Sequence, residues 1–211
     1  MLLPVLAYFT EILPIIFYLI FLKRNRGEGL WVIFLYSLLS LLTELLFEIL
    51  QRQIIYSIFT IVEFTLFSLF FYISLKEKRF KYIPIIGALI FYIVAISNFT
   101  NKKFDSLSVS LESILIIPYC ILLLYEQIKD PSIIFVYYNK KFWVIIAFFL
   151  YFSATLFLYI YYSTLSAEQR SNYWLINNFF EILKNILFCI AFIMKKNAQP
   201  SYLTDNLDPD I

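Results

Sequence analysis

Residues 142–162 read FWVIIAFFLYFSATLFLYIYY, a run without a single charged side chain. A helix rises about 1.5 Å per residue, so a run of this length crosses the hydrocarbon core of a bilayer, which is about 30 Å thick. Such a run would be insoluble in water and is well solvated by lipid. The stretch therefore predicts a transmembrane helix.

The composition extends this prediction to the whole chain. Of its 211 residues, 62% are hydrophobic and 15% are charged, whereas a soluble domain has about 25% charged residues. The sequence predicts an all-α integral membrane bundle of seven transmembrane helices, the fourth of which is the shortest. The predicted spans are Leu2–Leu22, Leu30–Leu50, Ile54–Leu75, Tyr82–Ser97, Leu107–Leu124, Phe142–Tyr162 and Trp174–Met194.

Residues 1–196 then form one transmembrane domain, and residues 197–211 are predicted to be a disordered cytoplasmic tail because they are polar and include Pro200 and Pro209. The N-terminus has no basic region before its apolar run, so no cleavable signal peptide is expected. Cys120 and Cys189 both fall in spans. Reduced, buried thiols are favoured, and a disulfide would require the two helices to touch.

Lysine and arginine predict how the bundle is oriented. The first, third and fifth loops and the tail hold twelve of them, against four in the other loops. Because cytoplasmic loops carry the excess of basic residues, this places the N-terminus outside and the C-terminus in the cytoplasm. The basic loops are topology signals first, and a cytoplasmic partner protein could also dock there. A net charge of +2 is too small to indicate nucleic-acid binding.

The first and last three predicted spans show an internal similarity, which would make the fourth a linker. Both triplets run in the same direction through the membrane, so this would be a parallel repeat; chance likeness between apolar helices is the alternative. The matched residues are Glu11 with Glu112, Trp31 with Trp143, Thr43 with Thr155 and Glu63 with Glu181.

This topology resembles the three-plus-one-plus-three superfamily of seven-helix membrane proteins, which includes SWEET and PQ-loop transporters and microbial rhodopsins. Pro14 and Pro118 match prolines of SWEET-type proteins in the first helix of each triplet, but the second helices have none and no Pro-Gln pair occurs. The chain is also similar in texture to small membrane proteins of Bacteroidetes-type bacteria. That likeness implies a multi-pass protein of the bacterial inner membrane and no particular function.

Charged residues inside the predicted spans are the candidate functional residues. An ionised side chain near the bilayer centre costs roughly 2.5–3.5 kcal/mol, so such residues face the bundle interior and usually have a purpose. Helical spacing places amides beside them on the last span. The candidate ligand- or ion-binding residues are Glu11, Glu44, Glu48, Glu63, Glu112, Glu181, Lys184, Asn177, Asn178 and Asn185.

The depth of these residues predicts a cavity. With the N-terminus outside, all six glutamates fall in the outer half or near the middle of their spans. Lys184 can pair with one or two carboxylates, either Glu181 one turn earlier or Glu63 across the bundle. The sequence therefore predicts an acid-lined cavity that opens outward and is closed toward the cytoplasm by Leu, Ile and Phe. The alternative is a polar network that only orients the helices.

Catalytic and cofactor motifs are missing. The chain has three glycines and no histidine, which excludes a Walker loop, a Ser–His dyad and the usual zinc-protease helix. We predict no enzyme activity, no metal site and no cofactor. Retinal on Lys184 is disfavoured because the companion acid Glu181 stands three residues before the lysine rather than the four typical of microbial rhodopsins, and the Arg/Asp/Trp pattern of their third helix is missing.

Two functions remain. The first is a permeation protein, carrier or channel, for a cation or a small polar solute, either as a monomer or as a homo-oligomer. The scarcity of glycine within the spans argues against it, because carriers usually need small residues at hinges and close contacts. The second is a membrane sensor or accessory subunit that couples an external ligand to a cytoplasmic partner.

Overall fold

The computed structural model describes residues 2–26, 29–50, 54–99, 105–131, 133, 135–162 and 164–195. The predicted tail, residues 197–211, lies outside the described residues, as do the loop cations Arg52, Lys102 and Lys103.

Seven long helices dominate the described part of the chain. They are α1 (Leu2–Ile20), α3 (Trp31–Leu50), α4 (Ile54–Ser74), α5 (Lys78–Ser97), α6 (Ser106–Lys129), α7 (Lys140–Tyr161) and α8 (Ala167–Ile193), with a short α2 (Leu22–Asn25) and a 3₁₀ turn, η1 (Val136–Tyr138). All seven are long and apolar enough to cross a membrane. This confirms the prediction of an all-helical, multi-pass bundle.

Three helix boundaries differ from the predicted ones by four residues or more. The fourth long helix, α5, begins at Lys78 and has 20 residues, one more than α1, so the prediction that it is the shortest was wrong. Its first turn holds cations whose long side chains can reach a polar surface while the backbone stays helical. Helix α6 continues to Lys129, and α8 already begins at Ala167.

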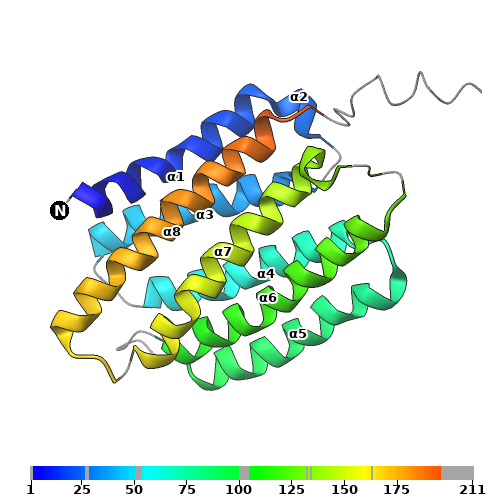
Figure 1. Ribbon diagram of the computed structural model, residues 1–211. Coiled ribbons are helices and arrows are strands. Elements are labelled where there is room, and N and C mark those ends of the chain that lie inside the picture. The colour runs from blue at the N-terminus through cyan, green and yellow to red at the C-terminus, as the bar shows by residue number, and fades with distance from the viewer. Residues whose placement is uncertain are drawn as a thin grey trace, which may run out of the picture.

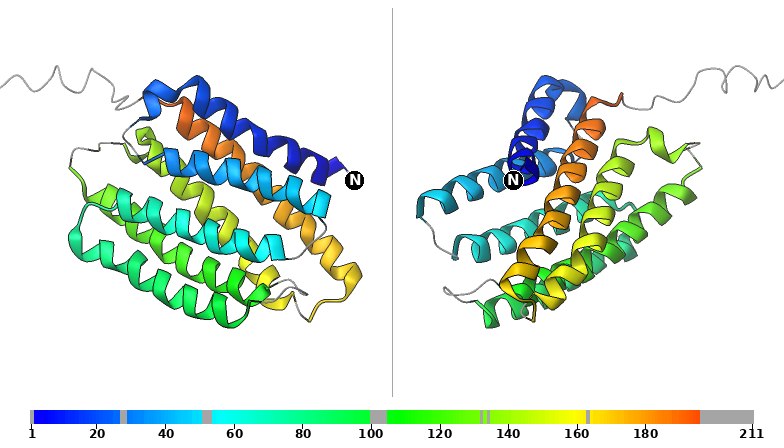
Figure 2. Two further views of the ribbon diagram at one scale, coloured as in Figure 1. Left: turned by 180° about the vertical axis from the view of Figure 1, so that it is seen from behind. Right: turned by 60° about the vertical axis from the view of Figure 1, so that its left-hand side comes forward.

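Neighbouring helices in the chain are also neighbours in space. Helix α3 packs against α1 and α4, and α7 packs against α6 and α8, while contacts between α1 and α8 and between α4 and α6 close the ring. Helix α5 lies outside this ring against α4 and α6 (Figures 1 and 2). We call the end of the bundle where α1, α4, α6 and α8 begin the N-terminal end.

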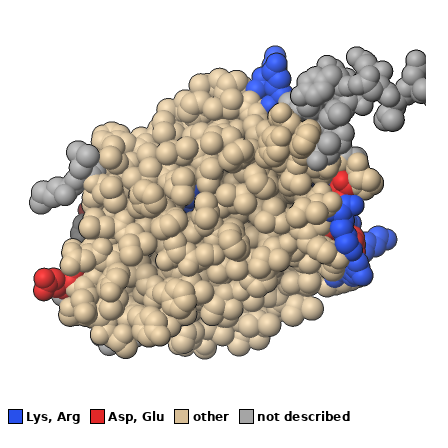
Figure 3. Space-filling model, viewed as in Figure 1, with Lys and Arg blue, Asp and Glu red and all other residues tan. Residues whose placement is uncertain are grey.

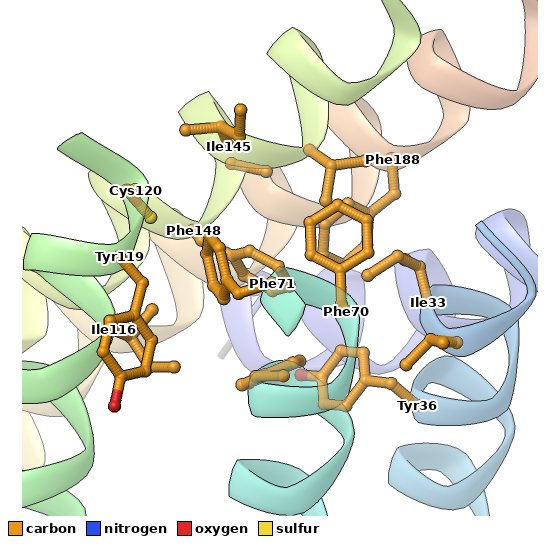
Figure 4. Close-up of a cluster of buried hydrophobic side chains, with 14 of the residues drawn as sticks. Ile33, Tyr36, Phe70, Phe71, Ile116, Tyr119, Cys120, Ile145, Phe148 and Phe188 are labelled. Carbon is orange, nitrogen blue, oxygen red and sulfur yellow. The ribbon is translucent and has the colours of Figure 1, made fainter. Parts of the chain in front are cut away.

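Packed phenylalanine rings fill the bundle between its middle and the opposite end. Phe148 of α7 lies with its ring centroid 4.4 Å from that of Phe67 and 5.4 Å from that of Phe188 (Figure 4). Phe70 and Phe71 each lie 6.0 Å from the same ring. None of these five side chains is exposed. We call this group, Phe67, Phe70, Phe71, Phe148 and Phe188, the phenylalanine plug.

Gly87 sets the approach of α5 to the bundle. A Cβ atom at this position would collide with the phenol of Tyr119 on α6, so only glycine allows the two helices to pack this closely.

Cys120, beside that tyrosine, and Cys189 are both buried and free, as predicted.

Polar side chains at the opposite end tie the helix ends together. Lys140, only 2% exposed, donates from Nζ to the carbonyl of Arg24 and to Oδ1 of Asn25, both at 2.9 Å. Glu126 accepts the backbone N–H groups of Lys76 and Glu77, at 2.8 and 2.9 Å, where α5 begins. Both charges lie outside the predicted spans, and the structure gives them buried structural contacts.

Figure 3 shows where charge lies on one face of the molecule. Charged side chains gather at the two ends, and the broad middle is almost entirely uncharged. The blue side chains on this face lie mainly at the end away from the N-terminus. This distribution fits a bundle whose middle contacts lipid.

Candidate functional site

A cavity of about 860 Å³ occupies the N-terminal end of the bundle. Its walls come from the first halves of α1 and α4, α3 from Tyr36 to Glu44, the second half of α7, α8 from Arg170 to Glu181, and the start of α6. We call it the acidic cavity. It is lined by Pro4, Ala7, Tyr8, Glu11, Tyr36, Ser40, Thr43, Glu44, Tyr56, Phe59, Thr60, Glu63, Ser106, Val109, Tyr151, Tyr159, Tyr162, Arg170, Trp174, Asn177, Asn178 and Glu181.

Four of the six candidate glutamates line this cavity, and they come from four different helices: Glu11, Glu44, Glu63 and Glu181. Helical spacing accounts for three of them, because Glu44, Glu63 and Glu181 each follow polar residues three or four positions earlier on the face that their helix turns inward. On α3, for example, Ser37 and Ser40 are buried and Glu44 is half-buried.

Glu11 of α1 has the most incomplete set of partners. Its side chain is 6% exposed, and its Oε1 accepts a hydrogen bond of 3.0 Å from Ser40. Its Oε2 is buried and has no hydrogen-bond partner among the described residues. A buried carboxylate oxygen left in this way is costly, so the cavity wall has an unfilled acceptor.

Lys184 lies where the acidic cavity meets the phenylalanine plug and is 2% exposed. Its Nζ donates to the phenol of Tyr36 and, at 3.2 Å, to Oε1 of Glu181. The same nitrogen lies 4.9 Å from the ring centroid of Tyr36 and 4.4 Å from that of Tyr151. Of the two predicted pairings, the structure shows the ion pair with Glu181. Glu63 hydrogen-bonds to Tyr36 and still interacts electrostatically with Lys184.

Tyrosines and amides form the rest of the polar wall. Oδ1 of Asn177 accepts hydrogen bonds from Tyr151 at 3.1 Å and from Tyr159 at 2.7 Å. Asn185, one turn beyond Glu181, is buried and donates to Oγ1 of Thr10 at 3.4 Å. Asn177 is therefore held in place by its neighbours.

The structure separates four candidates from the cavity wall: Glu48, Glu112, Lys184 and Asn185 are not among the lining residues. Glu48 is exposed at the end of α3. Glu112 is 1% exposed within α6, and its Oε1 has no partner among the described residues. Within the described part of the chain, no three His, Cys, Asp or Glu side chains gather closely enough to hold a metal ion.

Sequence reasoning missed Arg170 and most of the aromatic wall. Arg170 lines the cavity, with its guanidinium 4.7 Å from the ring centroid of Tyr162. It was assigned to a loop because the last span was predicted to begin at Trp174. The signal that would have found it is the capping box of Ser166 and Gln169, which starts α8.

The chain matches no protein-family model, no curated protein sequence and no solved structure. The geometry of the acidic cavity is therefore the basis for the functional argument.

Proposed function

We propose that this chain is a membrane permeation protein that takes a cation or a small polar solute into the acidic cavity. The observation that carries the proposal is the meeting of four carboxylates from four helices in one cavity of about 860 Å³. Buried carboxylates are costly in a bilayer unless they are matched, and Lys184 pairs with only one of them. Arg170 also lines the cavity, which still leaves more carboxylates than cations around it, and a cation that enters adds the further positive charge.

The proposed orientation places the cavity at the outer surface of a bacterial inner membrane, with the N-terminus outside. The excess of lysine and arginine in the other set of loops supports it. The phenylalanine plug closes the far side of the cavity, so passage requires the helices to rearrange. That favours a carrier over an open channel.

A parallel repeat of α1–α3–α4 and α6–α7–α8 about α5 would supply the moving parts. In each triplet the middle helix contacts both of its neighbours in the chain, which supports equivalent units. An oligomer in which copies of the bundle pack through their lipid-facing sides remains compatible with this arrangement.

A sensor or accessory subunit is the second candidate. The contacts of Lys140 with Arg24 and Asn25 join α2, at the end of α1, to the start of α7. A ligand in the cavity could shift these helices, and the basic loops beside this junction could pass the shift to a cytoplasmic partner. This function requires binding without transport.

We further propose that the chain is not an enzyme and carries no cofactor. Lys184, the lysine considered above for a Schiff base with retinal, already has its Nζ engaged by Glu181 and by two tyrosines. Purified protein supplied with retinal should show no visible absorption band. A band that disappears in Lys184→Ala would contradict this part of the proposal.

Flux through proteoliposomes tests the permeation function. Glu11→Gln and Glu63→Gln should each abolish cation or solute flux, because they remove charge from the cavity wall. Glu168→Gln, at an exposed glutamate in the first turn of the same bundle's α8, is the matched control and should retain flux. Flux that persists in both cavity variants, or that is missing from the unaltered protein for all common cations and solutes, would contradict the proposal.

A further inference from the structure

We propose that the acidic cavity is selective for an organic ammonium ion, such as a methylated or primary amine, over an inorganic cation. This inference rests on the proposed function and names its ligand class. It begins from the aromatic side chains of the wall. Rings line the cavity from α1, α3, α4, α7 and α8, among them Tyr8, Tyr36, Tyr56, Phe59, Tyr151 and Trp174. Ring faces attract cations, and cages of them are the usual recognition site for quaternary ammonium groups.

The protein already holds one ammonium group in this way. Nζ of Lys184 lies 4.4 Å from the ring centroid of Tyr151 and 4.9 Å from that of Tyr36, with the carboxylate of Glu181 at 3.2 Å. Tyr36, Tyr151 and Glu181 also line the cavity. The wall also offers rings and a carboxylate of the same kinds that do not contact Lys184, among them Tyr56, Phe59 and Glu44, and these are available to a second ammonium group.

The size of the cavity and the spacing of its acids point to the same ligand class. Small-molecule sites have volumes of roughly 300–1,000 Å³, and this cavity of about 860 Å³ falls in that range. Ca²⁺ and Mg²⁺ need several oxygen ligands at about 2.0–2.6 Å, and no three His, Cys, Asp or Glu side chains of the described residues are grouped for a metal ion. Carboxylates that come from four different helices around a wide cavity suit a large cation whose charge is spread over many atoms.

Glu11 supplies an independent indication that a ligand enters. It is more than nine-tenths buried, it lines the cavity, and its Oε2 has no partner among the described residues. A rotation of the Glu11 side chain toward the cavity would bring this buried acceptor to an ammonium N–H or to a hydroxyl carried by the ligand. The aromatic walls then hold the cation while Glu11 orients it.

Calorimetric titration of the purified protein in lipid nanodiscs tests the inference. The probes are choline, its uncharged isostere 3,3-dimethyl-1-butanol, tetramethylammonium, Na⁺ and K⁺. Choline and tetramethylammonium should bind at least about tenfold more tightly than the uncharged isostere and than either inorganic cation. Equal affinity for choline and the isostere, or tighter binding of Na⁺ or K⁺, would overturn it.

Four variants test whether aromatic rings of the wall bind choline. They distinguish the contribution of the ring from that of the tyrosine hydroxyl and from a general effect on folding. Tyr56→Leu should weaken choline binding about three- to tenfold, the loss expected for one cation–π contact, while Tyr56→Phe retains the ring and the affinity. Phe59→Leu is a second removal at the same wall, should Tyr56→Leu unfold. Tyr82→Leu, at an exposed ring of α5 outside the cavity, should change nothing. Unaltered choline affinity in both leucine variants of the wall would overturn the inference.

The outcome can be told apart from failure of the proposed function. Inorganic-cation flux without choline binding overturns the ligand class and leaves permeation standing. Choline binding without any flux supports the ligand class and contradicts permeation in favour of the sensor.

Discussion

The two halves of the bundle are built from the same helices and have opposite character. In the half at the N-terminal end, carboxylates, amides and phenols surround a cavity of about 860 Å³. In the other half, four phenylalanines with no exposed surface pack around Phe148, which is itself fully buried. Helix α4 passes from one to the other within about one turn, from Glu63 to Phe67. Along its axis, the bundle therefore separates a polar cavity from a region of close aromatic packing.

Removing the central ring of the plug should have the largest effect. Phe148→Ala should lower the free energy of unfolding by about 3–5 kcal/mol, because it deletes several ring contacts at once and leaves a void that the helices cannot close. Denaturant unfolding in bicelles measures this. Phe157→Ala, a change at a ring of the same helix that is 67% exposed, is the control and should cost far less. Equal losses would show that the plug is not the centre of stability.

A mutation of Lys184, which lies at the boundary between the two halves, should lower the free energy of unfolding by an intermediate amount. Lys184→Met leaves Glu181 without its cation, which should cost about 2 kcal/mol; a fully enclosed pair would cost about 3–5 kcal/mol, but Glu181 is 18% exposed. Adding Glu181→Gln should restore most of the loss. A double-mutant cycle on unfolding free energies measures the coupling. Strictly additive losses would contradict the pairing.

The smallest effect is expected within the cavity wall. Ser40→Ala removes one hydrogen bond to Glu11 and should cost about 1 kcal/mol, while it alters the position of that carboxylate for a ligand. The same unfolding assay gives the cost, with Ser97→Ala at an exposed position as the control. A loss as large as that of Phe148→Ala would show that the cavity half carries as much stability as the plug.

Much of the site was readable from helical spacing, and the misses have identifiable causes. Glu11, Glu44, Glu63 and Glu181 each follow the polar face of a predicted span, and all four line the cavity. Glu112 shares that spacing but is enclosed at 1% exposure, because periodicity places a residue on a face without showing what packs over it. Arg170 was missed because the start of the last helix was predicted from hydrophobicity alone. Ser166 and Gln169, which form the capping box at the start of α8, would have placed Arg170 inside the helix.

For basic residues too, the sequence pattern does not show which side chains are buried by distant segments. Lys140 reads as one more loop cation, but α2 brings Asn25 and the carbonyl of Arg24 to its Nζ. A cation at a helix terminus and a cation in solution have the same sequence pattern. Only the contacts made by distant segments distinguish them.

Seven bilayer-length helices, and the polar faces of the spans that carry the glutamates of the cavity, could be predicted from the amino-acid sequence alone. The physical reason is local: apolar run length and the 3.6-residue period act along one helix without reference to its neighbours. Only the tertiary structure decided that four of the acids share one cavity, that aromatic rings complete its wall, and that Lys184 lies between two tyrosines at its base. Those facts depend on which helices pack together and at what rotation, a choice made by side-chain fit across the whole bundle.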